Sequence, residues 1–543
     1  MSVIFPDELT VTDNYNMGRY GEVYLSSNGR QMQYAHLYTP DVAGYAAYEA
    51  EQALNRILID DGRTDQNPLV PMPYLDPDGT LRAGSTITNM TGVMGYGFSA
   101  YRIQPTGLMT FTQSNPRENT AVNGSLKFAS LNVLNYFTTI DTGAAICGPS
   151  EDMECRGADT LDELNRQRAK LVSAITGLDA DVIGLIEIEN NVNDDALIDL
   201  VDSLNAEAGA GTYSYIDTGT IGTDAIKVAL IYKPAKATPF GSYAILDDSF
   251  DPAYQDNLNR PSLAQTFVDP TTNGRVTVSV NHLKSKGCGG ETGGDVDQLD
   301  GQGCWNATRT AAAQILADWL ATDPTGSGYP NFLIMGDLNS YAMEDPITAL
   351  KDAGFVNLLD AFLGIDAYSY SFNGEFGYLD YALASPGLAP FVTDTAEWHI
   401  NSDEPRALDY NNFNQPFFFN PDQYRASDHD PVLVGIDLPT ISIVSPTEGE
   451  VFTSTNGLPT AVPVTVATTN FNIPADGHWH VWVDGAEIGP VLAYTTTVDL
   501  LPGSHVITAE LRSPSHLPLG PVASVSVTVN IQYVVNLPII MKP

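Results

Sequence analysis

The pattern of apolar and polar positions divides the chain into three blocks and a short tail. In the first block, residues 1–117, the apolar residues form short runs separated by turns, at 21–25, 56–60 and 92–96. Short runs bounded by Gly, Pro, Asn or Asp are typical of strands. We therefore expect residues 1–117 to form a small β-barrel, followed by a polar linker.

The second block, residues 119–438, alternates apolar runs of strand length with segments of helical periodicity. The strand candidates are 126–132, 181–189, 227–232, 276–282, 331–337, 378–382 and 431–436. Apolar residues recur at three- and four-residue spacing in 161–178 and 311–320, which predicts two helices there. This alternation is typical of an α/β domain.

The third block, residues 439–532, alternates apolar and polar positions in short strands between Pro and Gly turns, which predicts a β-sandwich. The tail, residues 533–543, is mostly apolar and carries one charge, Lys542; we read it as a sorting or anchoring remnant. No apolar run approaches the ~18 residues of a membrane-spanning helix, so we expect no membrane span.

The charge balance limits the kinds of partner. Lys and Arg number 25 against 66 Asp and Glu, which gives a formal net charge of −41. A protein that binds nucleic acid through general electrostatic attraction should be basic, so that class is excluded. Phosphate chemistry would need bound cations or a local basic patch. The acidity is typical of a protein that stays soluble in a salty extracellular medium.

The four cysteines form two local pairs, Cys147 with Cys155 and Cys288 with Cys304. Four cysteines allow three connectivities, and free thiols are the alternative. Neither pair has the spacing of a zinc site. Two disulfides favour an oxidising, extracellular compartment. Residues 1–6 lack the features of a signal peptide, so we expect that upstream residues have been trimmed.

Polar residues end, interrupt or precede the strand candidates of the central block. They are Asn132, Glu187, Glu189, His282, Asp337, Asn339, Asp380, Asp428 and His429. Oxygen ligands suit hard cations such as Mg²⁺, Mn²⁺ or Ca²⁺, and histidines near carboxylates suit acid–base chemistry and phosphate binding. The combination predicts metal-assisted hydrolysis of a phosphoester. Glu189 is ambiguous, because it shares a strand face with Glu187 and equally suits capping of the next loop.

Six motifs give the central block a resemblance to a known family. They are 127–133, 181–187, 280–285, Gly336-Asp337-Leu338-Asn339, 379–381 and Ser427-Asp428-His429-Asp430-Pro431. In type and order they resemble the endonuclease/exonuclease/phosphatase superfamily, especially its secreted bacterial extracellular nucleases. The resemblance implies a four-layer αββα sandwich, as in deoxyribonucleases, with the site at one end.

The resemblance also implies a metal site. Matched by motif, Asn132 and Glu187 would bind Mg²⁺ or Mn²⁺, and Asp428 would complete the metal or histidine network. Ca²⁺ is a further candidate ion.

Five more residues receive catalytic roles from the same resemblance. Asp337 would orient or deprotonate the attacking water, and Asn339 would hold that water or the phosphate. His429, oriented by Asp380, would stabilise charge on the phosphoryl oxygens. His282 would be a second phosphate donor or the acid for the leaving group.

Substrate contacts and the flanking blocks complete the prediction. Lys284 and Arg309 flank the second cysteine loop and are candidates for contacts to the phosphate backbone. The first block resembles the OB-like barrel that precedes the catalytic domain in these nucleases, and the third block resembles a bacterial Ig-like module.

The sequence as a whole predicts a secreted, divalent-metal-dependent nuclease. We expect a monomer, in some settings attached to a cell surface, that hydrolyses DNA, and RNA as a second candidate, with low sequence specificity. One alternative is a phosphatase or a lipid or sugar phosphodiesterase on the same scaffold. Another is a surface adhesion protein without catalysis, although the intact motifs at Asp337, Asn339, Asp428 and His429 disfavour it.

Overall fold

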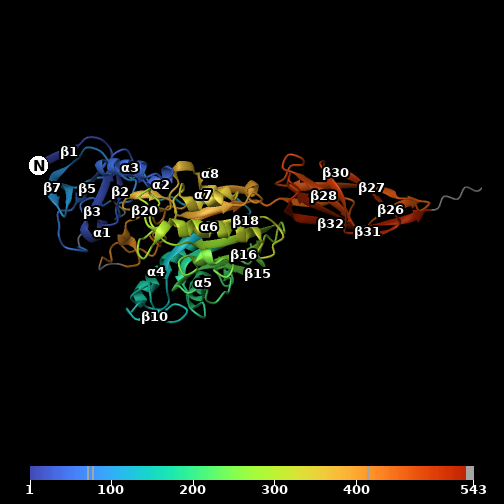
Figure 1. Ribbon diagram of the computed structural model, residues 1–543, viewed down its shortest axis with the longest axis horizontal. Coiled ribbons are helices and arrows are strands. Elements are labelled where there is room, and N and C mark those ends of the chain that lie inside the picture. Colours follow the sequence, from blue (N-terminus) through green and yellow to red (C-terminus); the bar gives the residue numbers. More distant parts are fainter. Residues whose placement is uncertain (70–71, 76–78, 412–414, 533–543) are drawn as a thin grey trace, which may run out of the picture.

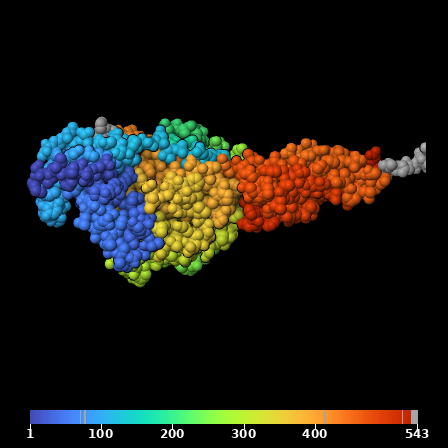
Figure 2. Space-filling view, turned by 90° about the horizontal axis from the view of Figure 1, so that it is seen from above, coloured from blue at the N-terminus to red at the C-terminus, as the bar shows by residue number. Residues whose placement is uncertain are grey.

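The computed structural model describes residues 1–69, 72–75, 79–411 and 415–532. The three blocks form three regions arranged in a row (Figure 1). In the space-filling view the C-terminal region projects from the central region (Figure 2). The predicted anchoring tail, 533–543, lies outside the described residues.

The N-terminal region is built on a seven-stranded sheet with the order β1-β7-β8-β5-β3-β2-β6. Its strands are β1 (Ser2–Phe5), β2 (Leu9–Asp13), β3 (Glu22–Ser26), β5 (Arg56–Asp60), β6 (Thr86–Ile87), β7 (Met90–Gly97) and β8 (Ala100–Pro105). Fully buried Val11, Val23, Ile59 and Ile103 form its core. The predicted strand content is confirmed, and the assignment to the OB class stays a prediction.

A helix, α3 (Val42–Leu54), lies in this region, where the sequence analysis expected only strands and turns. The Asp41 side chain caps it by accepting a hydrogen bond from the Gly44 amide at 2.6 Å. None of its residues is buried. A helix without a buried apolar stripe gives little periodic signal, which is why the pattern did not reveal it.

The central region contains two six-stranded sheets packed face to face. The first has the order β13-β14-β12-β9-β24-β23, with β13 (Ser214–Tyr215), β14 (Ile226–Tyr232), β12 (Val182–Glu189), β9 (Leu126–Tyr136), β24 (Val432–Ile436) and β23 (Val392–Glu397). The second has the order β15-β16-β17-β18-β22-β19, with β15 (Thr238–Leu246), β16 (Arg260–Val268), β17 (Arg275–His282), β18 (Phe332–Asp337), β22 (Asp380–Ala384) and β19 (Val356–Asn357).

Side-chain alternation along the strands separates the layers. On β12, Val182 and Ile186 pack between the sheets, whereas Ile183 and Leu185 pack with α4 (Leu161–Leu178) and α5 (Asp195–Ala208). Helices α6 (Asn306–Ala321) and α7 (Asp345–Asp352) pack on the second sheet. The predicted αββα sandwich and both predicted helices are therefore confirmed.

The C-terminal region consists of two sheets that share a core containing Trp479, Val464 and Ile507. One sheet has the order β25-β27-β30, with β25 (Thr440–Ser445), β27 (Thr460–Thr469) and β30 (Thr495–Leu500). The other has the order β26-β32-β31-β28-β29, with β26 (Glu450–Thr455), β32 (Pro518–Gln532), β31 (Gly503–Arg512), β28 (His478–Val483) and β29 (Ala486–Val491). The predicted strands are present; assignment to the Ig-like class stays a prediction.

The N-terminal region is joined to the central region by strand pairing. Strand β4 (Gln31–Met32) pairs in parallel with β21 (Glu375–Gly377), which forms a hairpin with β20 (Tyr370–Phe372). The hairpin thus extends from residues that line the candidate site to the N-terminal region.

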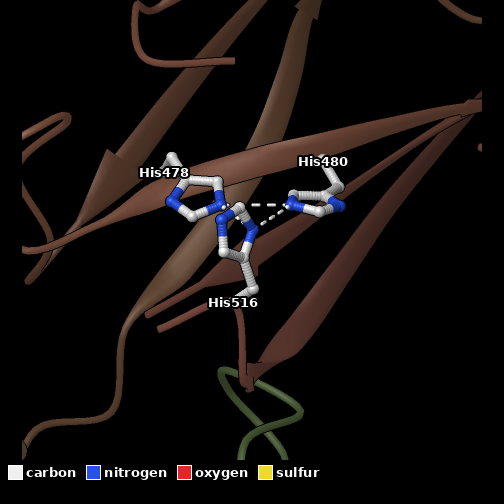
Figure 3. Close-up of side chains that lie close together, drawn as sticks. All are labelled: His478, His480 and His516. Carbon is white, nitrogen blue, oxygen red and sulfur yellow. Dashed lines mark hydrogen bonds between the residues drawn. The ribbon is translucent and has the colours of Figure 1, made fainter. Parts of the chain in front are cut away.

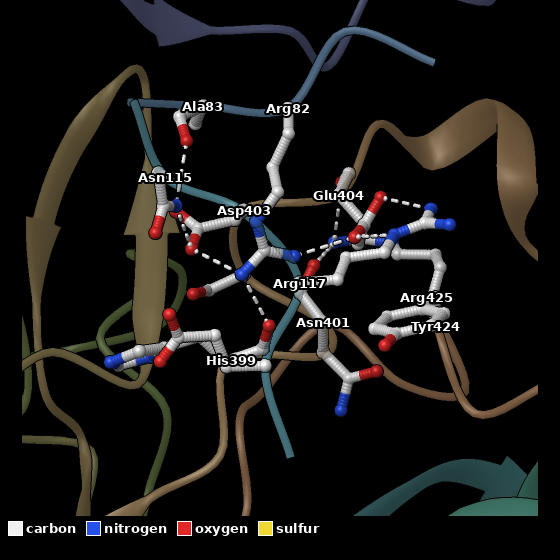
Figure 4. A network of polar contacts seen from close by, with 12 residues as sticks. Arg82, Ala83, Asn115, Arg117, His399, Asn401, Asp403, Glu404, Tyr424 and Arg425 are labelled. Atoms are coloured by element: carbon white, nitrogen blue, oxygen red, sulfur yellow. Dashed lines mark hydrogen bonds and ion pairs between the residues drawn. The ribbon is translucent and has the colours of Figure 1, made fainter. Parts of the chain in front are cut away.

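A buried ionic network also ties these two regions together (Figure 4). Arg30 and Arg82 contact Asp403 at 2.8 and 2.9 Å, and the Asp403 side chain is fully buried. Arg82 and Arg117 both pair with Glu404. Because both acids lie in the central region and all three arginines precede it, this junction is held by complementary charges.

Both predicted disulfides are present, Cys147–Cys155 and Cys288–Cys304. Among the described residues, we find no helix with the length and apolar character required to span a membrane.

Candidate active site

Strand ends from both sheets place the candidate residues around one pocket. In the second sheet, His282, Asp337 and Asp380 are successive register partners across β17, β18 and β22. The pocket has a volume of about 560 Å³, and six of the predicted residues line it: Glu187, His282, Asp337, Asn339, Asp428 and His429. Six of the predicted site residues therefore converge in space.

Glu187 reaches the pocket through an irregularity in β12. The register with both neighbouring strands shifts around it, and its backbone has a φ of 69°, in the left-handed region. A non-glycine residue in this conformation is strained and is often found at functional sites. Its Oε2 atom accepts hydrogen bonds from the backbone and side-chain amides of Asn135, at 3.2 and 2.9 Å.

Asp337 and Asn339 form a tight turn at the end of β18. The two Asp337 carboxylate oxygens accept hydrogen bonds from the backbone and side-chain amides of Asn339, at 2.7 and 2.9 Å. Burial raises the pKa of Asp337 to about 7, against the opposing effect of His429. Asn339 thus holds the carboxylate in place, and burial leaves the carboxylate able to exchange a proton near neutral pH.

His429 is held by Asp380. Its Nδ1 atom lies 2.7 Å from Asp380 Oδ2, which also accepts a hydrogen bond from the Ser369 hydroxyl at 2.7 Å. Burial disfavours the charged imidazolium, but Asp380, Asp428 and Asp337 raise the pKa of His429 well above its usual value. The site therefore contains a buried, positively charged donor within a strongly acidic protein.

His282 has the opposite electrostatic setting. Its Nε2 atom lies 3.4 Å from Arg260 Nη1 and 3.6 Å from Asp337 Oδ2. Burial, together with the positive charges of Arg260 and His429, lowers its pKa well below the usual value. His282 is consequently neutral, and a neutral imidazole suits hydrogen bonding to a phosphate better than protonation of a leaving group.

The acidic part of the pocket fits a divalent cation. Glu187 and Asp428 both line it, and burial together with the negative charge of Asp428 raises the pKa of Glu187. A cation between the two carboxylates would relieve that repulsion, and carboxylates suit Mg²⁺ or Mn²⁺. Asn132, the third predicted ligand, is the register partner of Ile186 on β9 and is buried. It is not among the residues that line the pocket, and its Oδ1 atom accepts a hydrogen bond from the Leu134 amide at 2.7 Å.

The comparison with known families agrees with this geometry. The model of the "Endonuclease/Exonuclease/phosphatase family" matches residues 129–429, more than half of the 543 residues. The chain belongs to this family. Members of the endonuclease/exonuclease/phosphatase family hydrolyse phosphoester bonds and generally use a divalent metal ion, commonly Mg²⁺.

Solved structures of this family resemble the chain at low identity. An endonuclease/exonuclease/phosphatase family protein from Bacteroides thetaiotaomicron is 16% identical, with a TM-score of 0.35 over 57% of this chain and 96% of its own. A mannosyl-6-phosphatase from the same species is 15% identical, with a TM-score of 0.36 over 57% and 99%. D. rerio TDP2 in complex with a single-stranded DNA product is 12% identical, with a TM-score of 0.35 over 57% and 97%. A search of curated proteins finds no match.

The structure contradicts the prediction that Arg309 binds substrate. Arg309 is fully buried, and its guanidinium donates to the carbonyls of Lys284, Gln302 and Cys304 and to the Ser340 hydroxyl. It supports the second cysteine loop from inside and has no surface for a phosphate.

Lys284 lies outside the pocket, and its contact to substrate stays a prediction. Its ammonium donates to the Ser285 hydroxyl at 2.9 Å and lies over the Trp305 ring, and Lys284 is not among the residues that line the pocket. The lysine that lines the pocket is Lys286, whose Nζ contacts Glu344 and the Gln302 carbonyl. Side chains in a loop follow no fixed periodicity, so the sequence alone could not show which of the two lysines faces the pocket.

Glu189, which the sequence left ambiguous, has a structural role. Its Oε2 atom accepts hydrogen bonds from the backbone amides of Thr138 and Thr139 and from the Thr138 hydroxyl. It holds the segment between β9 and the first cysteine loop and does not line the pocket.

Sequence reasoning missed the aromatic lining of the pocket. Tyr45 on α3, Tyr341, Tyr370 and Phe372 line it, as does Gln33 from the N-terminal region. Three of these residues carried no recognisable signal, because Tyr370, Phe372 and Tyr341 lie outside the six motifs. Tyr45 was missed together with its helix.

Proposed function

We propose that this protein is a secreted nuclease that uses a divalent metal ion to hydrolyse phosphodiester bonds in DNA, with RNA as a second substrate, at low sequence specificity. The observation that carries the proposal is that Asp337, His429 and the Glu187–Asp428 pair share one pocket with aromatic side chains. Aromatic faces stack on any nucleobase, which suits a nucleic acid better than a small phosphate monoester.

Glu187 and Asp428, with Asn132 beside them, are the residues that would hold the metal. A bound Mg²⁺ would neutralise phosphate charge and polarise the phosphoryl oxygen. Asp337, oriented by Asn339, accepts the proton of the attacking water, and its pKa of about 7 lies near the pH at which such a base works well.

The two histidines act on the phosphate in different ways. His429 is cationic and oriented by Asp380, so it stabilises negative charge that develops on the phosphoryl oxygens. His282 is neutral and donates a hydrogen bond to the phosphate. These fixed donors supply the positive potential that the chain as a whole, with a net charge of −41, does not provide.

The secreted location is proposed on two features of the chain. Both disulfides persist best in an oxidising compartment. The acidic composition keeps a protein dispersed in a salty medium.

A plasmid-nicking assay tests the function. We expect nicking with Mg²⁺ or Mn²⁺, none with EDTA, and a loss of roughly 10²–10⁴-fold in rate for His429→Ala. His505→Ala is the matched control, because His505 pairs with Asp484 in the C-terminal region.

Parallel assays with p-nitrophenyl phosphate and sphingomyelin distinguish the alternatives. Hydrolysis of either without nicking would replace the nuclease proposal, and no hydrolysis at all would favour a non-catalytic adhesion protein.

A further inference from the structure

Three histidines meet in the C-terminal region, far along the chain from the candidate active site (Figure 3). His478 and His480 lie on β28, and His516 lies in the turn between β31 and β32. The His478 Nε2, His480 Nε2 and His516 Nδ1 atoms are 2.9 to 3.1 Å apart in all three pairs. One nitrogen from each ring thus points to a common centre.

Hydrogen bonding alone cannot satisfy this arrangement. Each ring nitrogen either carries a proton or presents a lone pair. Among three nitrogens in mutual contact, at least two must be in the same state, so either two N–H groups or two lone pairs face each other. Three lone pairs directed at one cation remove the conflict, because every nitrogen then has the same role.

The strand geometry and burial favour a built site. His478 and His480 are two residues apart on β28, so they share one face of the sheet. They are 3% and 7% exposed, whereas His516 is exposed and closes the group from outside. Trp479, between them, is fully buried in the core on the opposite face, which fixes the strand.

A carboxylate orients one of the rings. Glu487 Oε1, on β29, lies 2.6 Å from His480 Nδ1. This contact places the proton on Nδ1 and leaves a lone pair on Nε2, the nitrogen that faces the other two histidines. Carboxylate partners of this kind commonly orient metal-binding histidines. Arg512, which lies nearby, has its charge paired with Glu510.

We propose that His478, His480 and His516 bind a transition-metal ion of the zinc type, with a remaining coordination position open to water. Imidazole ligands suit Zn²⁺ and its neighbours in the periodic table, whereas Mg²⁺ prefers oxygen. The site therefore differs in ion preference from the Glu187–Asp428 pair. A metal ion here links β28 to the β31–β32 turn and stabilises that end of the sandwich.

Zinc binding by the full-length protein tests this site. The protein is stripped with EDTA, dialysed into excess Mg²⁺, which occupies the carboxylate pair, and titrated with Zn²⁺ by calorimetry. We expect one Zn²⁺ site per chain. His516→Ala should lower the Zn²⁺ affinity by on the order of 100-fold or more, whereas His505→Ala should leave it unchanged. Glu487→Gln should weaken binding by about 10–100-fold.

Two further readouts separate this site from the active site and from misfolding. Zn²⁺ should raise the thermal midpoint of the wild-type protein and of Glu187→Gln, but not that of His516→Ala. Without metal, His516→Ala should melt as the wild type does, since the side chain is exposed. Equal Zn²⁺ affinity in wild type and His516→Ala, or binding that Glu187→Gln abolishes, would overturn the proposal. We expect the nuclease activity of His516→Ala to be unchanged. A failure of the metal-site proposal can therefore be told apart from a failure of the nuclease proposal.

Discussion

Burial determines what individual residues do in this site. Asp337 and His429 are both nearly inaccessible to solvent, yet their pKa values are raised for different reasons. Burial disfavours the charge on Asp337, whereas carboxylates around His429 outweigh the same effect and keep it charged. The pair can therefore provide a proton acceptor and a cationic donor at one pH.

Asp337→Asn should remove the proton acceptor and leave the fold intact. The amide is nearly isosteric and its oxygen can still accept the hydrogen bond from the Asn339 backbone amide, so we expect the variant to stay folded in a thermal melt. The nicking rate should fall by roughly 10²–10⁴-fold, the usual contribution of a general base. Asp345→Asn, on α7 outside the pocket, serves as the control. A variant with most of its activity left would assign the base role to another residue.

Residue identity at strand ends made most of the site predictable. Glu187 and Asp337 lie at the ends of strands and His429 just precedes β24, all in recognisable motifs, and the two sheets then bring them together. Arg309 was mispredicted because its burial depends on how the loop between Cys288 and Cys304 folds over it. Burial of a side chain by a loop from elsewhere in the fold produces no periodic pattern in the sequence.

At the scale of elements, Gly336 allows β18 to end in the turn formed by Asp337 and Asn339. Its φ is 117°, and a Cβ atom at this position would lie 2.2 Å from the backbone oxygen of Asn281 on β17. Strand β18 therefore needs glycine at its penultimate position to approach β17 and place Asp337 beside His282.

Gly336→Ala should accordingly destabilise the protein by on the order of 3 kcal/mol, measured by urea unfolding, because backbone strain and a backbone clash add. The nicking rate should fall as Asp337 shifts. Gly107→Ala is the control, since no atom of the residues that the structure describes lies within 4 Å of the added Cβ, and it should change stability by less than about 1 kcal/mol. Equal stability of the two variants would show that β17 and β18 can separate at no cost.

Elements with strong periodicity were predictable, and weakly patterned ones were not. Helix α4 buries Leu164, Leu171, Ile175 and Leu178 on one side, which produces a clear helical signal. Helix α3 buries nothing, and its place beside the pocket follows from pairing of β4 with β21, strands more than 340 positions apart. A contact at that separation is set by the tertiary fold and not by local pattern.

At the scale of the whole molecule, the junction between the N-terminal and central regions should respond to pH. Glu375, on β21 at this junction, is 8% exposed, and burial together with Glu49 raises its pKa to about 8. A carboxyl with a higher pKa in the folded state than in the unfolded state binds more protons when folded. Its contribution to stability is therefore lost as the pH rises from about 4.5 towards 8.

Glu375→Gln removes this dependence, because the amide stays neutral at every pH. We expect wild type and variant to have similar unfolding free energies at pH 5, and the variant to be more stable at pH 8 by up to about 4 kcal/mol. Glu51→Gln, at an exposed position of α3, should leave the profile unchanged. If the difference in unfolding free energy between wild type and Glu375→Gln were the same at pH 5 and pH 8, Glu375 would be ionised in the folded state.

The net charge of −41 predicts an unusual salt response for the proposed nuclease activity. A basic DNA-binding protein with several phosphate contacts loses about 10³–10⁵-fold in affinity between roughly 50 and 200 mM salt, because bound counterions are released. Here the long-range force between protein and polyanion is repulsive, and salt screens it within about 10 Å at 0.1 M. We expect kcat/KM for plasmid nicking, at fixed Mg²⁺, to rise or to change less than about 2-fold over this range. Bis-p-nitrophenyl phosphate, which carries one charge, is the control and should show a flat profile. A steep fall with plasmid alone would mean that local cations such as Lys286 and His429 dominate the encounter over the field of the whole chain.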